Sequence, residues 1–244
     1  MSMQALVLAA GWATRLGDLT GGGPKHLLPI GCRTPIDLVV DRLVAVPSIE
    51  RVTVITHDVA FPAFVEWATT RTDRLPVTVI SDGTKSLESR LGSIGDMAFF
   101  VREMEPNDDL IVVAGDNVFD FNLEPMVQAS RHDVAVGLYD VGSFSLASRY
   151  GIVEVDNEYT VTGFVEKPDQ PISTLAAVAI YGFPRVKLGV IQEFLDGSGN
   201  SDQSGSLIEW LHTRERVIGH VFGGRWIDIG SADEYKRAQL EFGG

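Results

Sequence analysis

The stretch from residue 8 to residue 30 reads Leu-Ala-Ala-Gly-Trp-Ala-Thr-Arg-Leu-Gly-Asp-Leu-Thr-Gly-Gly-Gly-Pro-Lys-His-Leu-Leu-Pro-Ile. It continues from an apolar run, residues 5–9, that predicts a buried strand, and it turns at Gly11. A strand that runs directly into a glycine turn leaves backbone N–H groups free to bind phosphate oxygens. Arg15 adds a guanidinium that can hold two oxygens, and Lys25 adds a point charge. The stretch therefore predicts a phosphate-binding loop that carries its own cations.

Up to residue 142, short apolar runs alternate with helical patterns. The runs are rich in β-branched and aliphatic residues, as expected of parallel strands that are covered on both faces. This alternation favours a three-layer, Rossmann-like α/β fold whose ligands lie beyond the carboxyl ends of the strands. The predicted strands are residues 5–9, 52–56, 77–81, 110–114 and 134–139, and the predicted helices are residues 35–46, 60–70, 92–104 and 123–131.

The pattern changes after residue 143, where apolar and polar residues alternate as in antiparallel strands. We expect a mixed, mostly parallel sheet with an antiparallel excursion, all within a single domain, residues 1–244. The expected strands of the excursion are residues 152–155, 160–164, 176–181 and 217–222. Helices are expected at residues 187–195, 206–213 and 232–240, and a polar, glycine-rich, mobile loop at residues 196–205.

Composition narrows the class of protein. The formal net charge of −13 argues against a nucleic-acid or anionic-membrane surface, although a phosphorylated substrate needs only a few local cations. The single cysteine, Cys32, excludes an internal disulfide. The apolar run near the start is too short for a signal peptide or a membrane span, so we expect a cytoplasmic protein.

The first loop does not match the common nucleotide fingerprints. It has neither Gly-x-Gly-x-x-Gly nor a Gly-Lys-Ser/Thr segment, which argues against a nicotinamide oxidoreductase and a Walker-type nucleotidase. Its Leu-Ala-Ala-Gly-x-x-Thr-Arg-Leu, followed by Pro-Lys-x-Leu-Leu-Pro-Ile, instead resembles the signature of the sugar-1-phosphate nucleotidylyltransferases. The closest group by resemblance is the glucose-1-phosphate thymidylyltransferases, in a short form without a C-terminal extension.

Four later segments follow in that family's order, so that the resemblance spans residues 4 to 240. They are Val-Val-Ala-Gly-Asp-Asn at 112–117, Tyr-Gly-Ile-Val at 150–153, Val-Glu-Lys-Pro at 165–168 and Arg-Trp-Ile-Asp-Ile-Gly at 225–230. Each has a structural interpretation when taken alone, because Asp116 or Asp228 could cap a helix and Glu166 and Lys167 could form a surface pair. Their common order favours the functional interpretation.

The resemblance implies a site and a division of the chain. Arg15 and Lys25 would be catalytic, and Asp116 and Asp228 would hold Mg²⁺. Residues 1–142 would form the nucleotide half and residues 143–244 the sugar-phosphate half. The implied nucleotide-binding residues are Leu8, Ala9, Ala10, Gly11, Trp12, Arg15, Asp82 and Gly83, and the implied substrate-binding residues are Asn117, Tyr150, Gly151, Glu166 and Lys167. Arg90 and Ser93 are further candidates for contact with the nucleotide, although Arg90 could instead lie on the solvated face of a helix.

The chain departs from the family pattern at two places. Residues 82–96 keep a glycine and a helix start but lack the family's base-reading residues, and residues 204–209 lack an arginine that would contact the sugar phosphate. The resemblance favours dTTP and glucose-1-phosphate as substrates. A guanylyl-, uridylyl- or cytidylyltransferase for another sugar or cyclitol phosphate, and a catalytically silent nucleotide-sugar-binding domain, stay open, as does a homo-oligomer.

Overall fold

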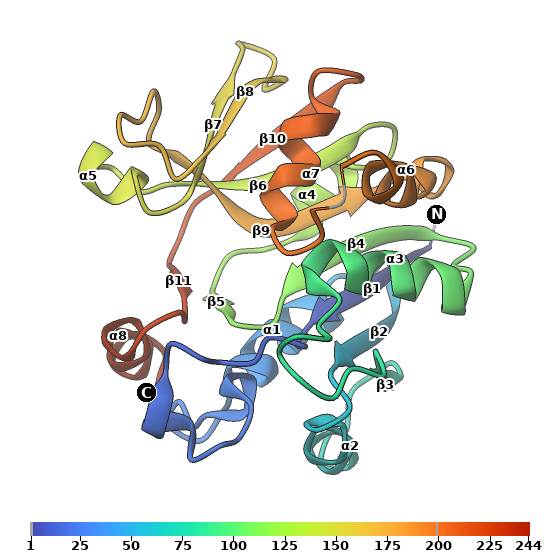
Figure 1. Cartoon of the computed structure of the whole chain (residues 1–244), viewed down its shortest axis with the longest axis vertical. Helices are drawn as coiled ribbons and strands as arrows, with labels where there is room; N and C mark the ends of the chain where they lie inside the picture. The colour runs from blue at the N-terminus through green and yellow to red at the C-terminus, as the bar shows by residue number, and fades with distance from the viewer. Residues whose placement is uncertain (1, 199) are drawn as a thin grey trace.

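The computed structural model describes residues 2–198 and 200–244 and is built on one large sheet (Figure 1). The strand order is β10-β6-β9-β4-β1-β2-β3. The four strands on the β3 side run parallel to one another, as predicted. These strands are β1 (Met3–Leu8), β2 (Ile49–Thr56), β3 (Val77–Ser81) and β4 (Asp109–Ala114).

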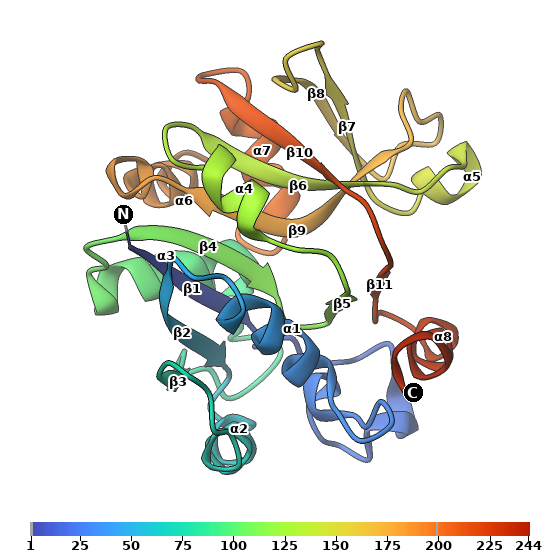
Figure 2. The same ribbon diagram turned by 180° about the vertical axis from the view of Figure 1, so that it is seen from behind.

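Helices cover both faces of the sheet, which confirms the three-layer expectation (Figures 1 and 2). Alternate side chains of β1 enter different cores: Ala5 and Val7 pack on one face, and Leu6 packs on the other. The first core contains α1 (Pro35–Val44), α2 (Phe61–Thr69) and α4 (Glu124–Ala129). The second contains α3 (Gly92–Met104), α6 (Gly189–Ser198) and α7 (Ser204–Leu211).

The second half of the sheet corrects part of the expected excursion. Strand β9 (Leu175–Phe183) lies antiparallel between β4 and β6 (Val134–Asp140), inside the main sheet. Strand β10 (Val217–Phe222) pairs parallel to β6, so the prediction of an antiparallel strand there was wrong. Whether a strand runs parallel or antiparallel to its neighbour cannot be read from its own sequence pattern, because both orientations bury the same residues.

The remaining short elements project from this sheet (Figure 1). Strands β7 (Gly151–Val155) and β8 (Val161–Glu166) form the expected antiparallel hairpin, preceded by the short helix α5 (Phe144–Ala147). Strands β5 (Asn117–Phe119) and β11 (Trp226–Asp228) form a two-stranded ladder that sequence analysis missed, and α8 (Ala232–Phe242) closes the chain. Helices α6 and α7 occupy both ends of the loop expected at residues 196–205.

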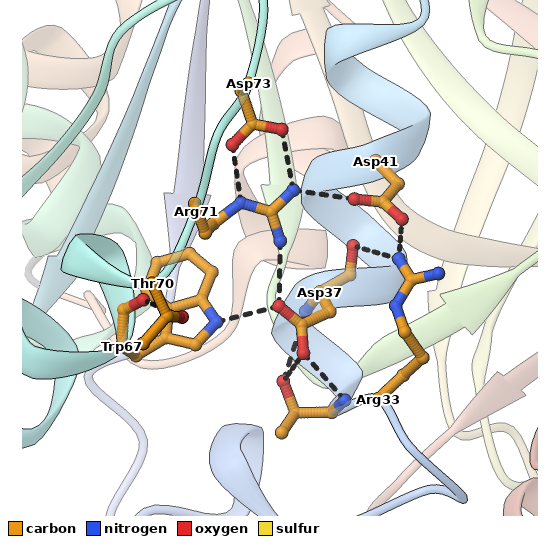
Figure 3. A network of polar contacts seen from close by, with 8 residues as sticks. Arg33, Asp37, Asp41, Trp67, Thr70, Arg71 and Asp73 are labelled. Carbon is orange, nitrogen blue, oxygen red and sulfur yellow. Dashed lines mark hydrogen bonds and ion pairs between the residues drawn. The ribbon is translucent and has the colours of Figure 1, made fainter.

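An ion network joins α1 to the segment that follows α2 (Figure 3). The three guanidinium nitrogens of Arg71 donate to Asp37, Asp41 and Asp73 over distances of 2.6 to 2.8 Å. Asp37 also accepts from Thr34, the N-cap of α1, and from the indole of Trp67 at 2.8 Å. Burial opposes the charge of Asp37, but these donors together hold its pKa below the usual range.

The boundary proposed at residue 142 follows β6, and the main sheet contains strands from both sides of it. The division into two halves stays a prediction. Over the described part of the chain, no helix combines the length and the apolar character that a membrane crossing requires.

Candidate active site

The loop after β1 has the free donors that its sequence predicts. Within the part of the chain that the structure describes, the backbone N–H groups of residues 10 to 15 have no hydrogen-bond acceptor. Ala13 holds a left-handed conformation with φ of 52°, and the chain then enters a short 3₁₀ helix, Gly17–Thr20. Arg15 is exposed and lines a cavity together with Asp228. The loop therefore presents N–H groups and a guanidinium to the same region.

Lys25 lies in the 3₁₀ helix Lys25–Leu27, and its side chain is 10% exposed. Its ammonium forms an ion pair with Asp116 and donates to the carbonyl of Ile229 at 3.3 Å. Burial lowers the pKa of Lys25, but the Asp116 carboxylate beside it outweighs burial, so the net shift is upward and the side chain is charged. The sequence-predicted lysine and aspartate therefore meet although they are far apart in the chain.

Asp116 and Asp228 lie at one end of the β5–β11 ladder. Asp228 is paired with Asn117, the neighbour of Asp116, and the Ile229 N–H donates to the Asp116 carbonyl at 3.0 Å. The ladder brings the two predicted metal ligands to the same place, on the same side of the molecule as Lys25.

The two carboxyls differ in their electrostatics. Burial raises the pKa of Asp116, but Lys25 reverses this and holds it below the usual range. For Asp228, burial and then the charge of Asp116 raise the pKa to about 7. The Asp228 carboxylate accepts no hydrogen bond within the described ranges, so it is open to a ligand in the cavity that it lines.

Two cavities meet at Asp116. The first has a volume of about 380 Å³ and lies between the loop after β1 and the start of α3. The second has a volume of about 310 Å³ and lies against the β7–β8 hairpin and β9. Both are lined by Ser93, Ala114, Asp116, Asp202 and Ser204. The site can therefore hold two ligands that touch at the Asp116 carboxylate.

Most of the predicted nucleotide-binding residues line the first cavity, namely Leu8, Ala10, Gly11, Trp12, Asp82, Arg90 and Ser93. Ala9 is fully buried and Gly83 is exposed beside the cavity, and neither is among its lining residues. The Trp12 ring stacks on His57, with ring centroids 4.0 Å apart. It therefore packs within the protein and also faces the cavity.

Arg90 and Ser93 bind the segment before α7, in which Asp202 lines both cavities. Arg90 donates two hydrogen bonds to the Asp202 carboxylate, at 3.0 and 2.7 Å, and Ser93 donates to the Asp202 carbonyl at 3.0 Å. Both cavities border this segment. Nothing in the sequence marks Asp202 as a cavity residue, because a lone aspartate in a polar loop resembles any solvated residue.

The second cavity gathers the predicted substrate-binding residues. Asn117, Tyr150, Gly151, Glu166 and Lys167 all line it. A Cβ atom on Gly151 would lie 2.5 Å from the Phe164 ring and 2.9 Å from Glu166 Oε2, so a larger residue there would have to displace these side chains. A Cβ atom on Gly205 would lie 2.6 Å from the Phe164 ring and 3.1 Å from Glu166 Oε2. Both glycines therefore lie close to the Phe164 ring and the Glu166 carboxylate.

Asn117 has a structural task that its motif did not reveal. It is 2% exposed, its amide donates to the Val178 carbonyl at 3.1 Å, and it accepts from the Trp226 indole at 2.8 Å. Both functional groups of its side chain are therefore engaged in joining β5 to β9 and β11.

Two further lining residues were missed. Arg149 borders the second cavity directly before Tyr150 and forms no ion pair within the described segments. Asp96 lines the first cavity and is buried. The sequence did contain a sign of Asp96, since a carboxylate stands there among the apolar positions of a predicted helix. The helical pattern alone does not show that this position borders a cavity.

The match to known proteins agrees with this geometry. A model of the nucleotidyl transferase family matches residues 4–242. The chain belongs to this family. A protein of Sulfolobus acidocaldarius, provisionally named mannose-1-phosphate guanyltransferase, is 28% identical over 239 residues, which cover 98% of this chain and 63% of that protein. The chain thus spans less than two thirds of that relative's length.

Solved structures share the fold. The chain is similar to a UDP-glucose pyrophosphorylase from Acinetobacter baumannii, with a TM-score of 0.82, 22% identity and coverage of 100% of this chain and 94% of that one. It is also similar to a Bacillus anthracis protein, provisionally named glucose-1-phosphate thymidylyltransferase, in complex with a sucrose, with a TM-score of 0.77, 21% identity and coverage of 98% and 94%. These likenesses confirm the Rossmann-like, mostly parallel architecture.

Proposed function

We propose that the protein transfers a nucleotidyl group from a nucleoside triphosphate to a sugar-1-phosphate, releasing pyrophosphate and forming a nucleotide sugar. The observation that carries the proposal is the meeting of Lys25, Asp116 and Asp228 where two ligand-sized cavities join. A binding domain without activity does not require a buried ammonium and two carboxylates at that junction.

The reaction needs alignment more than acid–base chemistry. A sugar-1-phosphate is a dianion near neutral pH, because the second pKa of a phosphate monoester is about 6. Its oxygen forms a bond to the α-phosphorus while the bond to the bridging oxygen of the β-phosphate breaks, and pyrophosphate leaves with that electron pair. The protein must bring two anions together and offset the charge of the leaving group.

The cations at the junction fit this task. The free N–H groups of the first loop and Arg15 would bind the triphosphate, and Lys25 would contact the reacting phosphates. Lys167 and Arg149 would hold the sugar phosphate in the second cavity. Arg149 would take the role of the family arginine that residues 204–209 lack.

The carboxyl pair suits Mg²⁺, which proteins bind through one or two carboxylates while substrate phosphates and waters complete the shell. Asp116 and Asp228 supply such a pair, and the open Asp228 carboxylate fits a ligand position. No larger cluster of metal-binding side chains occurs among the described residues. Bound Mg²⁺ would offset phosphate charge. Lys25 would hold the Asp116 carboxylate in place meanwhile.

The test is a pyrophosphate-release assay with a panel of triphosphates and sugar-1-phosphates in the presence and absence of Mg²⁺. We expect Mg²⁺-dependent release with at least one pair, and we expect Asp228→Asn to lose it. dTTP with glucose-1-phosphate is the pair that the resemblance favours, and guanylyl, uridylyl and cytidylyl donors are in the panel. Nucleotide binding without turnover of any pair would support the silent binding domain instead.

A further inference from the structure

Two carboxyls line the first cavity at a distance from the reacting groups. Strands β4, β1, β2 and β3 are in register, so that Ala114, Leu8, Ile55 and Ile80 are aligned across the sheet. Asp116 comes two residues after Ala114 in this row, and Asp82 comes two residues after Ile80. The strands that they follow, β4 and β3, are three strand spacings apart, or about 14 Å. A nucleotide whose α-phosphate lies at Asp116 reaches with its base toward Asp82. The carboxyls of Asp82 and Asp96 therefore border the base end of the cavity.

Asp82 is fixed as a hydrogen-bond acceptor. Its Oδ1 accepts from the backbone N–H and the hydroxyl of Thr84, both at 2.7 Å, and its Oδ2 lies 2.9 Å from the same hydroxyl. The residue is buried at the end of β3, where its own N–H donates to the Thr56 carbonyl at 2.9 Å. Such a carboxylate can accept hydrogen bonds from a ligand but has none to donate.

Asp96 lies beside Asp82, and the two carboxyls share a side-chain hydrogen bond. Asp96 is 5% exposed, and its Oδ1 is buried without a hydrogen-bond donor in the described ranges. Burial, and then the neighbouring charge of Asp82, raise the pKa of Asp96 to about 8. Asp96 therefore keeps its proton at neutral pH and directs it toward Asp82 through their side-chain hydrogen bond. A buried carboxyl oxygen without a hydrogen-bond donor, such as Asp96 Oδ1, lowers the stability of the protein unless a ligand donates to it.

The Watson–Crick edges of the bases differ in what they offer to such a pair. Guanine carries two adjacent donors, N1–H and the N2 amino group, which match the two acceptors of a carboxylate. Uracil and thymine carry one N–H between two carbonyl oxygens, and those oxygens would face the oxygens of the pair. Cytosine and adenine place an amino donor next to an unprotonated ring nitrogen, which would need a proton from the pair itself.

We infer that Asp82 and Asp96 read the donor base and select guanine, so that the favoured triphosphate is GTP. This inference rests on the proposed nucleotidyl transfer and deepens it by naming the base. It departs from the thymine donor that the resemblance favours. A site built to hydrogen-bond N–H groups discriminates strongly against ligands that lack them, because its acceptors are then left unpaired.

The experiment compares GTP, ITP, dTTP, UTP, CTP and ATP in two assays, pyrophosphate release and calorimetric binding. GTP is expected to exceed dTTP and UTP in kcat/KM by about 100-fold or more. ITP lacks only the N2 amino group, and it should fall about 10-fold or more below GTP because one hydrogen bond is lost. The binding constants should follow the same order, whether or not turnover occurs.

The variant Asp82→Asn replaces the fixed acceptor by an amide that also donates. It should lower kcat/KM for GTP by about 30-fold or more while UTP and dTTP hold or gain, because an acceptor–donor pair suits their edge. The matched control is Glu88→Gln, which removes a carboxylate from the same segment at an exposed position that does not line the cavity. The Glu88→Gln variant should rank the six nucleotides in the same order as the wild type.

The outcomes separate the inference from the proposed function. Turnover that prefers dTTP, UTP, CTP or ATP, or a GTP preference that Asp82→Asn leaves intact, overturns the base assignment and leaves nucleotidyl transfer standing. No turnover with any pair overturns the proposed function, and the binding order then decides the base assignment alone. Equal binding of all six nucleotides would contradict it.

Discussion

Two clusters of charged side chains in this protein are built from the same groups and reach opposite results. In the network around Arg71, each guanidinium nitrogen donates to a carboxylate, and Asp37 has further donors (Figure 3). At the junction of the cavities, Lys25 pairs with Asp116, but the Asp228 carboxylate accepts no hydrogen bond within residues 2–198 and 200–244. The first cluster is complete within the protein, whereas the second leaves charge and donors to be matched by a ligand.

The difference indicates how structure and function divide the charged residues. A closed network fixes two helices and lowers the pKa of its carboxyl group Asp37. The open cluster raises the pKa of Asp228 to about 7 through burial and the charge of Asp116. Carboxyl groups with shifted pKa values in a cavity are expected at functional sites, since the free-energy cost of burying them is offset only when a ligand binds.

The largest effect is expected from opening the closed network. Arg71→Ala leaves three carboxylates without their common partner and should lower the free energy of unfolding by about 3 kcal/mol or more. The kcat of the folded protein should stay unchanged. Urea denaturation measures the first quantity, and Arg102→Ala, which removes an exposed ion pair with Glu103, is the control at about 0.5 kcal/mol or less. Equal losses in the two variants would contradict the role of the network.

Removing the cation of the open cluster should act on the reaction. Lys25→Met is expected to reduce kcat by about 100-fold, on the order of 3 kcal/mol in the barrier, because a fixed charge at the transferring phosphate is lost. Steady-state pyrophosphate release measures it. Lys236→Met, at an exposed position on α8, is the control and should retain full activity. A Lys25→Met variant with wild-type kcat would make this cluster a structural one like that of Arg71.

The carboxyl pair of the first cavity should give the stability a pH dependence. Asp96 has a pKa of about 8 in the folded protein, above its unfolded value near 3.8, so its favourable contribution is complete below pH 3.8 and is lost as pH rises toward 8. Asp96→Asn removes this loss. The variant should therefore gain about 2 kcal/mol or more relative to wild type between pH 5 and pH 8. Urea unfolding at both values measures the gain, and a constant difference would show that Asp96 is charged in the folded state.

The smallest effect is expected from Thr34, which contacts Asp37 at the start of α1. Thr34→Ala removes the N-cap of α1, whose hydroxyl accepts from the Asp37 N–H at 3.3 Å. It should cost about 1 kcal/mol in unfolding free energy. Thr34→Ser keeps the hydroxyl and should restore most of this. Thermal or urea unfolding is sufficient, since the helix lies away from the cavities, and pyrophosphate release should not change.

Much of the site was accessible from the sequence because its residues lie in local motifs. The loop after β1, Lys25 after Pro24, Asp116 after β4 and Asp228 before α8 each follow a predictable element. Short-range patterns determine where strands end, and polar residues at the carboxyl ends of parallel strands gather at one edge. The sequence also predicted the fold class and most element positions, since these depend on hydrophobic period.

Other features depended on contacts between distant segments. The parallel pairing of β10 with β6 and the β5–β11 ladder join strands far apart in the chain, and no local pattern encodes such partners. Asp96, Arg149 and Asp202 line the candidate site only because α3, the turn before β7 and the segment before α7 meet around two cavities.

The sequence by itself determined the α/β class, the loop after β1 with its unpaired N–H groups and the set of charged residues proposed for catalysis, because hydrophobic period and turn chemistry are local. Only the tertiary structure decided which charges are satisfied and which stay open, such as Arg71 against Asp228, and that a buried acid pair lines the first cavity. Burial and the distance between charges set these properties, and both arise when segments remote in sequence pack together.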